Sequence, residues 1–290
     1  MSNSTVPPRI SGLSEIAPSY AAILCDVWGV VHNGVRSFPA ACDALARFRE
    51  AGGTVVLLTN APRLSPYIVA QMRSLGVTEA SYDGIVTSGD VTRGLLASRP
   101  GAKVLHIGSD IHLPLYEGLD LTLVDSAEAD VISCTGLRED ERESPDDYDA
   151  ELRALAARGL PLICANPDIV VERGNRFIWC AGALAERYRG FGGVTHVAGK
   201  PHAPIYEAAL AHIGALRGTA VAKSDVLAIG DGAPTDLKGA KGEGLDILFV
   251  TGGIHAANFG PTEQPDSSAV ARFLSEEQLA ARAFIPHLQW

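Results

Sequence analysis

Short, uninterrupted apolar runs rich in valine, isoleucine and leucine constrain the fold of this chain more than any other feature. Continuous runs of this length are typical of strands that are buried on both faces, as in parallel sheets covered by helices. Such runs occur at residues 21–30, 54–60, 103–108, 121–125, 129–136, 160–166, 225–231 and 246–253. We therefore expect a largely parallel, buried sheet.

Helical segments separate the apolar runs. Residues 37–51 and 65–75 carry apolar side chains at helical spacing, and a glycine that can end a helix follows each of them. A third helix is expected at 202–216. Alternating strands and helices predict βαβ units and a doubly wound α/β fold.

Composition excludes several classes of protein. Hydrophobic residues make up 47% of the 290 residues and charged residues 20%, which is typical of a folded chain with one large or two ordinary domains. The net charge of −10 disfavours binding to nucleic acid or to an anionic membrane. No apolar run reaches the length of a transmembrane helix, and the first residues lack the order of a signal peptide. We expect a cytoplasmic protein.

The cysteines indicate neither a disulfide framework nor a zinc site. Their number is odd, and no C-x-x-C pair occurs. We expect buried free thiols, which pack as small apolar groups. The residues are Cys25, Cys42, Cys134, Cys164 and Cys180.

Polar residues follow several of the expected strands or precede an expected helix. Ligands of open parallel sheets bind at the carboxyl ends of the strands, so these side chains are candidates for one site. They are Asp26, Thr59, Asn60, Lys200, Asp231 and Asp236.

This set of side chains suits phosphoryl transfer. Asp26 and Asp231 could hold Mg²⁺, which prefers carboxylate oxygens. Thr59 and Lys200 could supply a hydroxyl donor and a positive charge to phosphate oxygens. Each feature alone also has a structural explanation, as a helix cap or a turn, so the hypothesis rests on their order along the chain.

Four segments resemble the motifs of the haloacid dehalogenase (HAD) superfamily of phosphatases. They read Asp26-Val-Trp-Gly-Val30, Leu57-Leu-Thr-Asn60, Gly199-Lys-Pro201 and Gly230-Asp-Gly-Ala-Pro-Thr-Asp236. Two segments between the second and third motif, Ala165-Asn-Pro-Asp168 and Cys180-Ala-Gly-Ala-Leu184, resemble the capped IIA branch of that superfamily. The resemblance implies a Rossmann-like core at 1–88 and 197–290, with an inserted α/β cap at 89–196. It also implies a possible homodimer formed through the cap.

The resemblance implies a role for each matching residue. Asp26 would be the nucleophile and a Mg²⁺ ligand. Thr59 and the Asn60 amide would hold the phosphoryl group, and Lys200 would neutralise it. Asp231 would bind Mg²⁺.

Three further positions complete the expected site. Asp236 would support the lysine or a metal-bound water and is counted with the metal-binding residues. Asn166 and Asp168 match a segment of the cap that faces the substrate in the family.

Trp28 departs from the family pattern. The first motif of the family is D-x-D, and its second aspartate donates a proton to the leaving group. Trp28 stands at that position and cannot donate a proton in that way, although its backbone carbonyl could still bind the metal. Acid–base catalysis typically contributes ~10²–10⁴ in rate. Its loss should slow the hydrolysis of alkyl phosphates most, because their leaving alkoxides need the proton.

Three interpretations of Trp28 stay open. The protein could be a slow phosphatase, or another side chain such as His32 could replace the acid, or the chain could bind a phosphorylated ligand without turnover. In the last case the indole could stack on an aromatic ligand. Arg63 is a further cation close to the expected phosphate site, while His202 and His255 have mainly structural explanations.

The sequence as a whole favours a Mg²⁺-dependent phosphatase that acts on a small phosphorylated metabolite through an aspartyl-phosphate on Asp26. The alternative is a catalytically silent protein that binds a phosphorylated ligand on the same fold.

Overall fold

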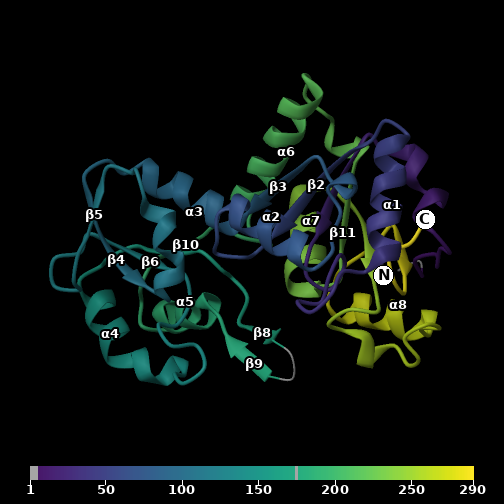
Figure 1. Cartoon of the computed structure of the whole chain (residues 1–290). Helices are drawn as coiled ribbons and strands as arrows, with labels where there is room; N and C mark the ends of the chain where they lie inside the picture. Colours follow the sequence, from purple (N-terminus) through teal and green to yellow (C-terminus); the bar gives the residue numbers. More distant parts are fainter. Residues whose placement is uncertain (1–5, 174–175) are drawn as a thin grey trace. The chain divides into compact units, whose positions relative to one another are not determined.

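The chain forms two compact units, each built around its own parallel sheet. The computed structural model describes residues 6–173 and 176–290. Unit 1 comprises residues 1–59, 69–86 and 206–290, and unit 2 comprises residues 60–68 and 87–205 (Figure 1). The expected insertion at 89–196 lies wholly within unit 2. Unit 2 also holds residues 60–68, 87–88 and 197–205, which the sequence placed with the core.

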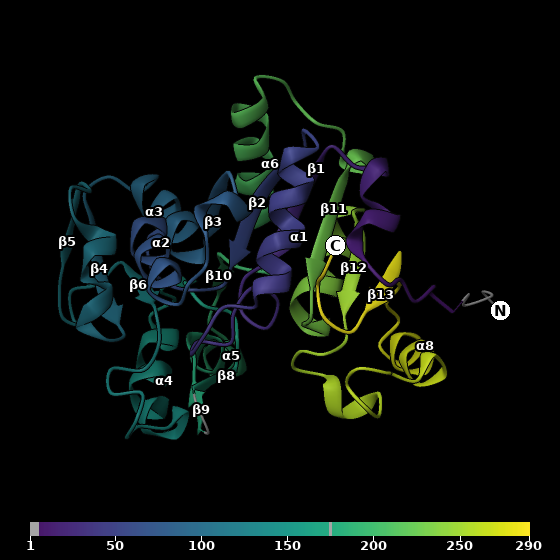
Figure 2. The ribbon, with the colours of Figure 1, turned by 45° about the vertical axis from the view of Figure 1, so that its right-hand side comes forward.

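The sheet of unit 1 has six strands in the order β13-β12-β11-β1-β2-β3. The chain passes from β1 outward to β2 and β3, and it later passes from β11 outward in the other direction to β12 and β13, which lie beside β11 in Figure 2. The strands are β1 (Ala22–Asp26), β2 (Thr54–Thr59), β3 (Gly84–Thr87), β11 (Val226–Gly230), β12 (Asp246–Val250) and β13 (Ala283–Ile285).

The sheet of unit 2 has five parallel strands in the order β10-β7-β6-β4-β5. They are β4 (Ala102–Ile107), β5 (Leu121–Leu123), β6 (Val131–Cys134), β7 (Leu162–Cys164) and β10 (Thr195–Val197). A separate antiparallel hairpin pairs β8 (Val170–Arg173) with β9 (Arg176–Trp179).

Helices provide the apolar covering that the sequence led us to expect. The helices are α1 (Pro39–Glu50), α2 (Ser65–Ser74), α3 (Ser88–Ala97), α4 (Asp149–Ala157), α5 (Ala181–Gly190), α6 (Ala203–Arg217), α7 (Lys238–Glu243) and α8 (Ser267–Glu276). In unit 2, one buried cluster joins a face of the sheet to α4 and α5, and a second joins the other face to α3. Both faces of that sheet are therefore covered, which explains why its central strands are continuously apolar.

Each of the eight apolar runs overlaps a strand, and the helices expected at 37–51, 65–75 and 202–216 are α1, α2 and α6. Strand β5 differs from the expectation of a buried strand, because it lies at the edge of its sheet and leaves Leu123 42% exposed. All five cysteines are buried, and none of them forms a disulfide. Among the described residues, no helix is both long and apolar enough to cross a membrane.

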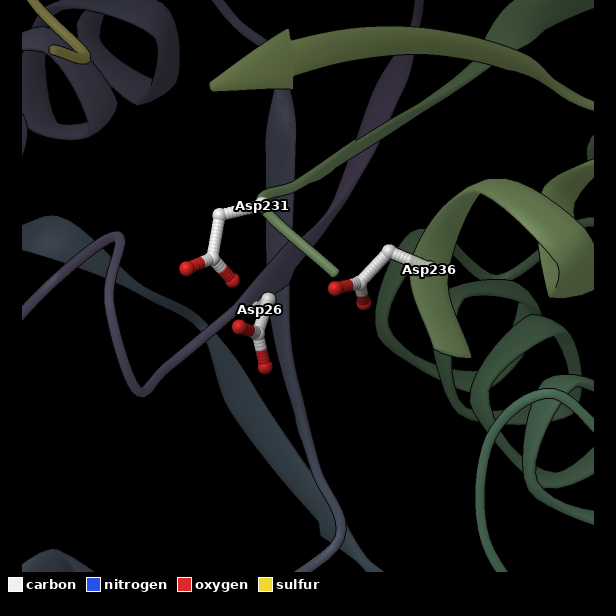
Figure 3. A group of neighbouring side chains, drawn as sticks. All are labelled: Asp26, Asp231 and Asp236. Carbon is white, nitrogen blue, oxygen red and sulfur yellow. The ribbon is translucent and has the colours of Figure 1, made fainter. Parts of the chain in front are cut away.

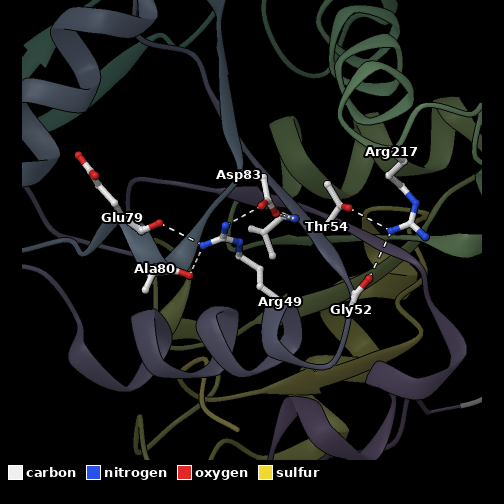
Figure 4. Close-up of polar contacts among 8 residues, drawn as sticks. Arg49, Gly52, Thr54, Glu79, Ala80, Asp83 and Arg217 are labelled. Carbon is white, nitrogen blue, oxygen red and sulfur yellow. Dashed lines mark hydrogen bonds and ion pairs between the residues drawn. The ribbon is translucent and has the colours of Figure 1, made fainter.

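Two arginines connect the helices of unit 1 to its sheet and loops. Arg49 of α1 donates hydrogen bonds to the carbonyl oxygens of Glu79 and Ala80 and lies 2.6 Å from Asp83 Oδ1 (Figure 4). Arg217, the last residue of α6, donates to Thr54 Oγ1 at 3.0 Å. These bonds fix β2 and its flanking turns, and Thr59 ends that strand.

Candidate active site

Three carboxylates converge at the carboxyl edge of the unit 1 sheet (Figure 3). Asp26 ends β1, Asp231 follows β11, and Asp236 lies in the π-helical turn Ala233–Leu237. One oxygen from each carboxylate lies within 4.8 Å of those of the other two, and all three residues are buried. Because β1 and β11 are neighbours whose connections leave in opposite directions, this is the topological switch point where open α/β sheets bind ligands.

Backbone groups hold two of the carboxylates in place. Asp231 Oδ2 accepts the Ile254 N–H at 2.8 Å, and Asp236 Oδ2 accepts the Gly232 N–H at 3.0 Å. Neither bond brings a positive charge. Three carboxylates this close repel one another, and a divalent cation relieves that repulsion while using oxygen ligands that Mg²⁺ prefers. The residues present therefore fit a hard divalent metal ion.

Glycines let the chain pass close to these carboxylates. Gly29 has a φ of +83°, and a Cβ there would lie 2.3 Å from Asp231 Oδ2. A Cβ at Gly230 would lie 2.2 Å from the Cγ of Asp236. Any side chain at either position would displace a carboxylate, so the glycines of the first and fourth motif have a direct packing role.

Asn60 organises the expected site residues of unit 2. Its Oδ1 accepts the Lys200 N–H at 2.7 Å, and its Nδ2 donates to Lys200 O at 3.2 Å and to Asp168 Oδ1 at 2.9 Å. Asn166 Oδ1 accepts the Asp168 N–H at 3.1 Å. The structure thus brings Asn60, Lys200, Asn166 and Asp168 together within unit 2, as it brings the three aspartates together within unit 1. The side chain of Asn60 therefore connects the backbone of Lys200 to the side chain of Asp168.

Trp28 has a defined position in the loop after β1. Its ring lies edge-on to His32, with 5.3 Å between the ring centroids, and it is 37% exposed. Gly34 lies directly against the indole, since a Cβ at that position would be 2.3 Å from Trp28 Cη2. The indole is therefore a fixed, partly exposed surface two residues after Asp26.

His32 is neither an exposed loop residue nor well suited to proton donation. It is 3% exposed, and its Nδ1 accepts the Gly34 N–H at 3.0 Å. Burial lowers the pKa of His32 to about 4. At neutral pH the imidazole is thus uncharged and is a poor acid, and its hydrogen bond to Gly34 instead fixes the loop that carries Trp28.

The remaining single residues have structural contacts. His255 Nε2 accepts the Ala233 N–H at 3.1 Å and so supports the turn that carries Asp236. The His202 N–H donates to Gly199 O at 3.0 Å, one residue before α6 begins. Arg63 belongs to unit 2, where its guanidinium lies 5.5 Å from the centroid of the Tyr67 ring.

Sequence reasoning missed the packing glycines and the backbone donors around the three carboxylates. Gly253 is the clearest example, because a Cβ there would lie 1.9 Å from Asp231 Oδ2. The Gly-Gly pair at the end of the apolar run at 246–253 was the available signal.

The fold and the carboxylate site define a hydrolase of the haloacid dehalogenase superfamily, and the chain belongs to that family. Residues 23–122 match the family model described as haloacid dehalogenase-like hydrolase, and residues 197–276 match a second model described as HAD-hydrolase-like. Its relatives place it close to the subclass IIA phosphatases.

Three relatives illustrate the similarity. The D-glycerol 3-phosphate phosphatase of Mycobacterium tuberculosis is 30% identical over 265 residues, which cover 84% of this chain and 67% of that protein. The ribonucleotide monophosphatase NagD of Escherichia coli K12 is 25% identical over 80% of this chain and 88% of its own. A crystal structure of a haloacid dehalogenase-like hydrolase from Brucella suis 1330 is 50% identical, with a TM-score of 0.84 over 97% of this chain and 99% of that one.

Proposed function

We propose that the chain is a Mg²⁺-dependent phosphatase that hydrolyses a small phosphorylated metabolite. The observation that carries this proposal is the convergence of three buried carboxylates, within 4.8 Å of one another, at the switch point of the unit 1 sheet. Two relatives whose names include an activity, the glycerol phosphate phosphatase and NagD, are phosphatases, which supports the same reaction class.

In the proposed reaction Asp26 is the nucleophile. One of its carboxylate oxygens bonds to phosphorus while the bond between phosphorus and the leaving oxygen breaks, which gives an aspartyl-phosphate and a leaving-group anion that takes any proton it needs from water. Water then attacks phosphorus, inorganic phosphate leaves, and the Asp26 carboxylate is restored. Asp26, Asp231, Asp236 and the Trp28 carbonyl would hold Mg²⁺, which when bound would supply positive charge to the phosphoryl oxygens.

The other residues of the motifs have binding roles in this proposal. The Thr59 hydroxyl and the Asn60 backbone N–H donate to phosphoryl oxygens, and the Lys200 ammonium neutralises them. Asn166 and Asp168 contribute to selection of the organic part of the substrate, with unit 2 acting as the cap.

Trp28 gives a reason to retain a second candidate function. No proton-donating carboxylate stands at position 28, and His32 is a neutral, buried imidazole. A protein that binds a phosphorylated ligand without turnover would have this arrangement. Hydrolysis of aryl and acyl phosphates distinguishes the two functions, because their weakly basic leaving groups need little protonation by an acid. A phosphatase would hydrolyse them, and a binding protein would not.

Phosphate release from aryl, acyl and alkyl phosphates in the presence of Mg²⁺ tests the proposal. We expect turnover of aryl or acyl phosphates, and a fall in kcat of at least about a thousandfold in Asp26→Asn. Asp43→Asn, which removes an exposed carboxylate paired with Arg47, is the matched control and should keep full activity. Full activity in Asp26→Asn would overturn the mechanism, and inertness of the wild type towards the whole panel would favour the binding protein.

A further inference from the structure

The sheet of unit 2 has a switch point of its own. From β4 the chain passes to β5 on one side, and from β6 it passes to β7 on the other side, while β4 and β6 lie next to each other (Figure 1). Neighbouring parallel strands with connections that leave in opposite directions create a crevice at their carboxyl ends, where α/β sheets bind ligands. In unit 1 the equivalent position holds the three aspartates.

Three polar side chains meet at this second switch point. His106 is the penultimate residue of β4, Thr135 directly follows β6, and His112 lies in the 3₁₀ segment Asp110–Tyr116 after β4. His106 Nε2 lies 3.0 Å and His112 Nδ1 lies 2.9 Å from Thr135 Oγ1. Thr135 is buried, whereas both imidazoles are partly exposed and so can be reached from solvent.

Gly108 makes this arrangement possible. Its φ is +151°, and a Cβ at that position would lie 1.9 Å from Thr135 Oγ1 and 3.0 Å from His106 Nε2. The chain therefore passes against the hydroxyl at a distance that only glycine permits. This close approach of backbone to a polar cluster is a common feature of ligand sites.

The geometry limits the positions of the protons. Burial lowers the pKa of both His106 and His112 to about 4, so each neutral ring has one donor and one acceptor nitrogen. The Thr135 hydroxyl donates either to Ile107 O at 3.5 Å or to one of the two rings. In the first case both imidazoles donate to Thr135, and in the second case only one of them does.

The two outer nitrogens, His106 Nδ1 and His112 Nε2, are both acceptors in the first case, and one donor and one acceptor in the second case. Within residues 6–173 and 176–290 the structure gives neither atom a hydrogen-bond partner. Arg63 Nε is a further donor that is buried and has no acceptor in the described part of the chain. A hydroxyl group both donates and accepts, so it matches the pair of outer nitrogens.

Charges of both signs surround the two rings. Asp110 and Arg138 act on His106 with opposite signs, and Asp140 and Arg63 do the same on His112. Arg138 is also paired with Glu151 at 2.9 Å. Three carboxylates against two guanidinium groups disfavour an anion.

We propose that the carboxyl edge of β4 and β6 is a binding site for a small, uncharged molecule with several hydroxyl groups, a polyol or sugar, held by His106, His112 and Thr135. The proposal does not rest on the phosphatase function, because it concerns an unphosphorylated ligand and unit 2 alone.

Long-range ¹H–¹⁵N NMR of the imidazole rings of the full chain tests the site, with xylitol as the probe. We expect saturable shifts of the ring nitrogens of His106 and His112 on titration. The ring of His196, exposed on β10 at the far edge of the same sheet, should not move. Thr135→Val should weaken binding by about three- to tenfold, the equivalent of one hydrogen bond, while Thr195→Val on β10 should leave it unchanged.

Several outcomes would overturn the proposal. These are no saturable shift of either ring, an equal shift of His196, or unchanged binding in Thr135→Val. Tighter binding of inorganic phosphate than of xylitol at the same rings would show an anion site instead. If Thr135→Val fails to fold, the wild-type titration with the His196 reference still decides.

Discussion

Gly253 lies so close to Asp231 that a Cβ at position 253 would be 1.9 Å from Asp231 Oδ2 and 2.4 Å from Asp231 Cβ. The next residue, Ile254, donates its N–H to the same oxygen at 2.8 Å. The turn after β12 therefore encloses one side of the Asp231 carboxylate.

Gly253→Ala should weaken metal binding without removing any carboxylate. The added methyl group displaces the Asp231 side chain, and loss of ligand orientation typically costs about 10- to 100-fold in metal affinity. Isothermal titration with Mg²⁺ measures this change. Gly242→Ala is the matched control, because a Cβ at Gly242 meets nothing within 4 Å and should leave the affinity unchanged. Equal Mg²⁺ affinities in the wild type, Gly253→Ala and Gly242→Ala would show that Asp231 does not bind the metal.

Trp28→Asp should extend activity to alkyl phosphates. An aspartate at position 28 could donate the proton that the leaving alkoxide needs, and general acid catalysis typically contributes ~10²–10⁴ in rate. The ratio of kcat/KM for alkyl over aryl substrates is the measurement. Trp179→Asp, which changes a partly exposed tryptophan of unit 2, is the control. If the wild type is inert and Trp28→Asp is active, the native protein is a binding protein.

Asn60→Asp should destabilise unit 2 and lower activity together. The substitution keeps the acceptor for the Lys200 N–H but removes the donor to Lys200 O and Asp168, and it places a second carboxylate beside Asp168. An unsatisfied buried carbonyl costs ~1–3 kcal/mol, and the two like charges add to this. Urea unfolding measures the loss. Asn258→Asp, a change in a short surface turn of unit 1, should be nearly neutral.

Acidification should destabilise the protein between about pH 6.5 and pH 4. His106 and His112 have pKa values lowered to about 4 by burial, so the unfolded chain binds more protons than the folded one in this range. Their contribution is fully present above ~6.5 and is lost as the pH falls towards 4, with a slope of up to ~1.4 kcal/mol per pH unit for each histidine.

Urea midpoints measured across this pH range check the prediction for His106 and His112. His112→Gln should flatten the dependence. A slope in His112→Gln identical to that of the wild type would show that His112 does not titrate as the structure indicates.

The sequence predicted those features of the fold and site that depend on patterns of neighbouring residues along the chain. The apolar runs predicted the buried strands, and the order of Asp26, Thr59, Lys200 and Asp231 indicated the family that the comparisons support. The grouping of the three aspartates follows from strand order, which a doubly wound fold largely determines.

Features that depend on tertiary packing could not be predicted in this way. The burial of His32, the edge position of β5 and the role of the Asn60 side chain all depend on residues distant in the sequence or on sheet position. The His106–Thr135–His112 cluster is likewise invisible until β4 and β6 are known to be neighbours.

The bonds between Asn60 and Lys200 join residues 140 positions apart. They close the intervening chain into one large loop whose ends meet at a fixed place. Closure of a flexible loop becomes only ~0.6 kcal/mol more costly for each doubling of its length. Insertions in the surface loops of this segment would therefore lengthen it at little cost in closure entropy, while Asn60 and Lys200 still meet at the same place.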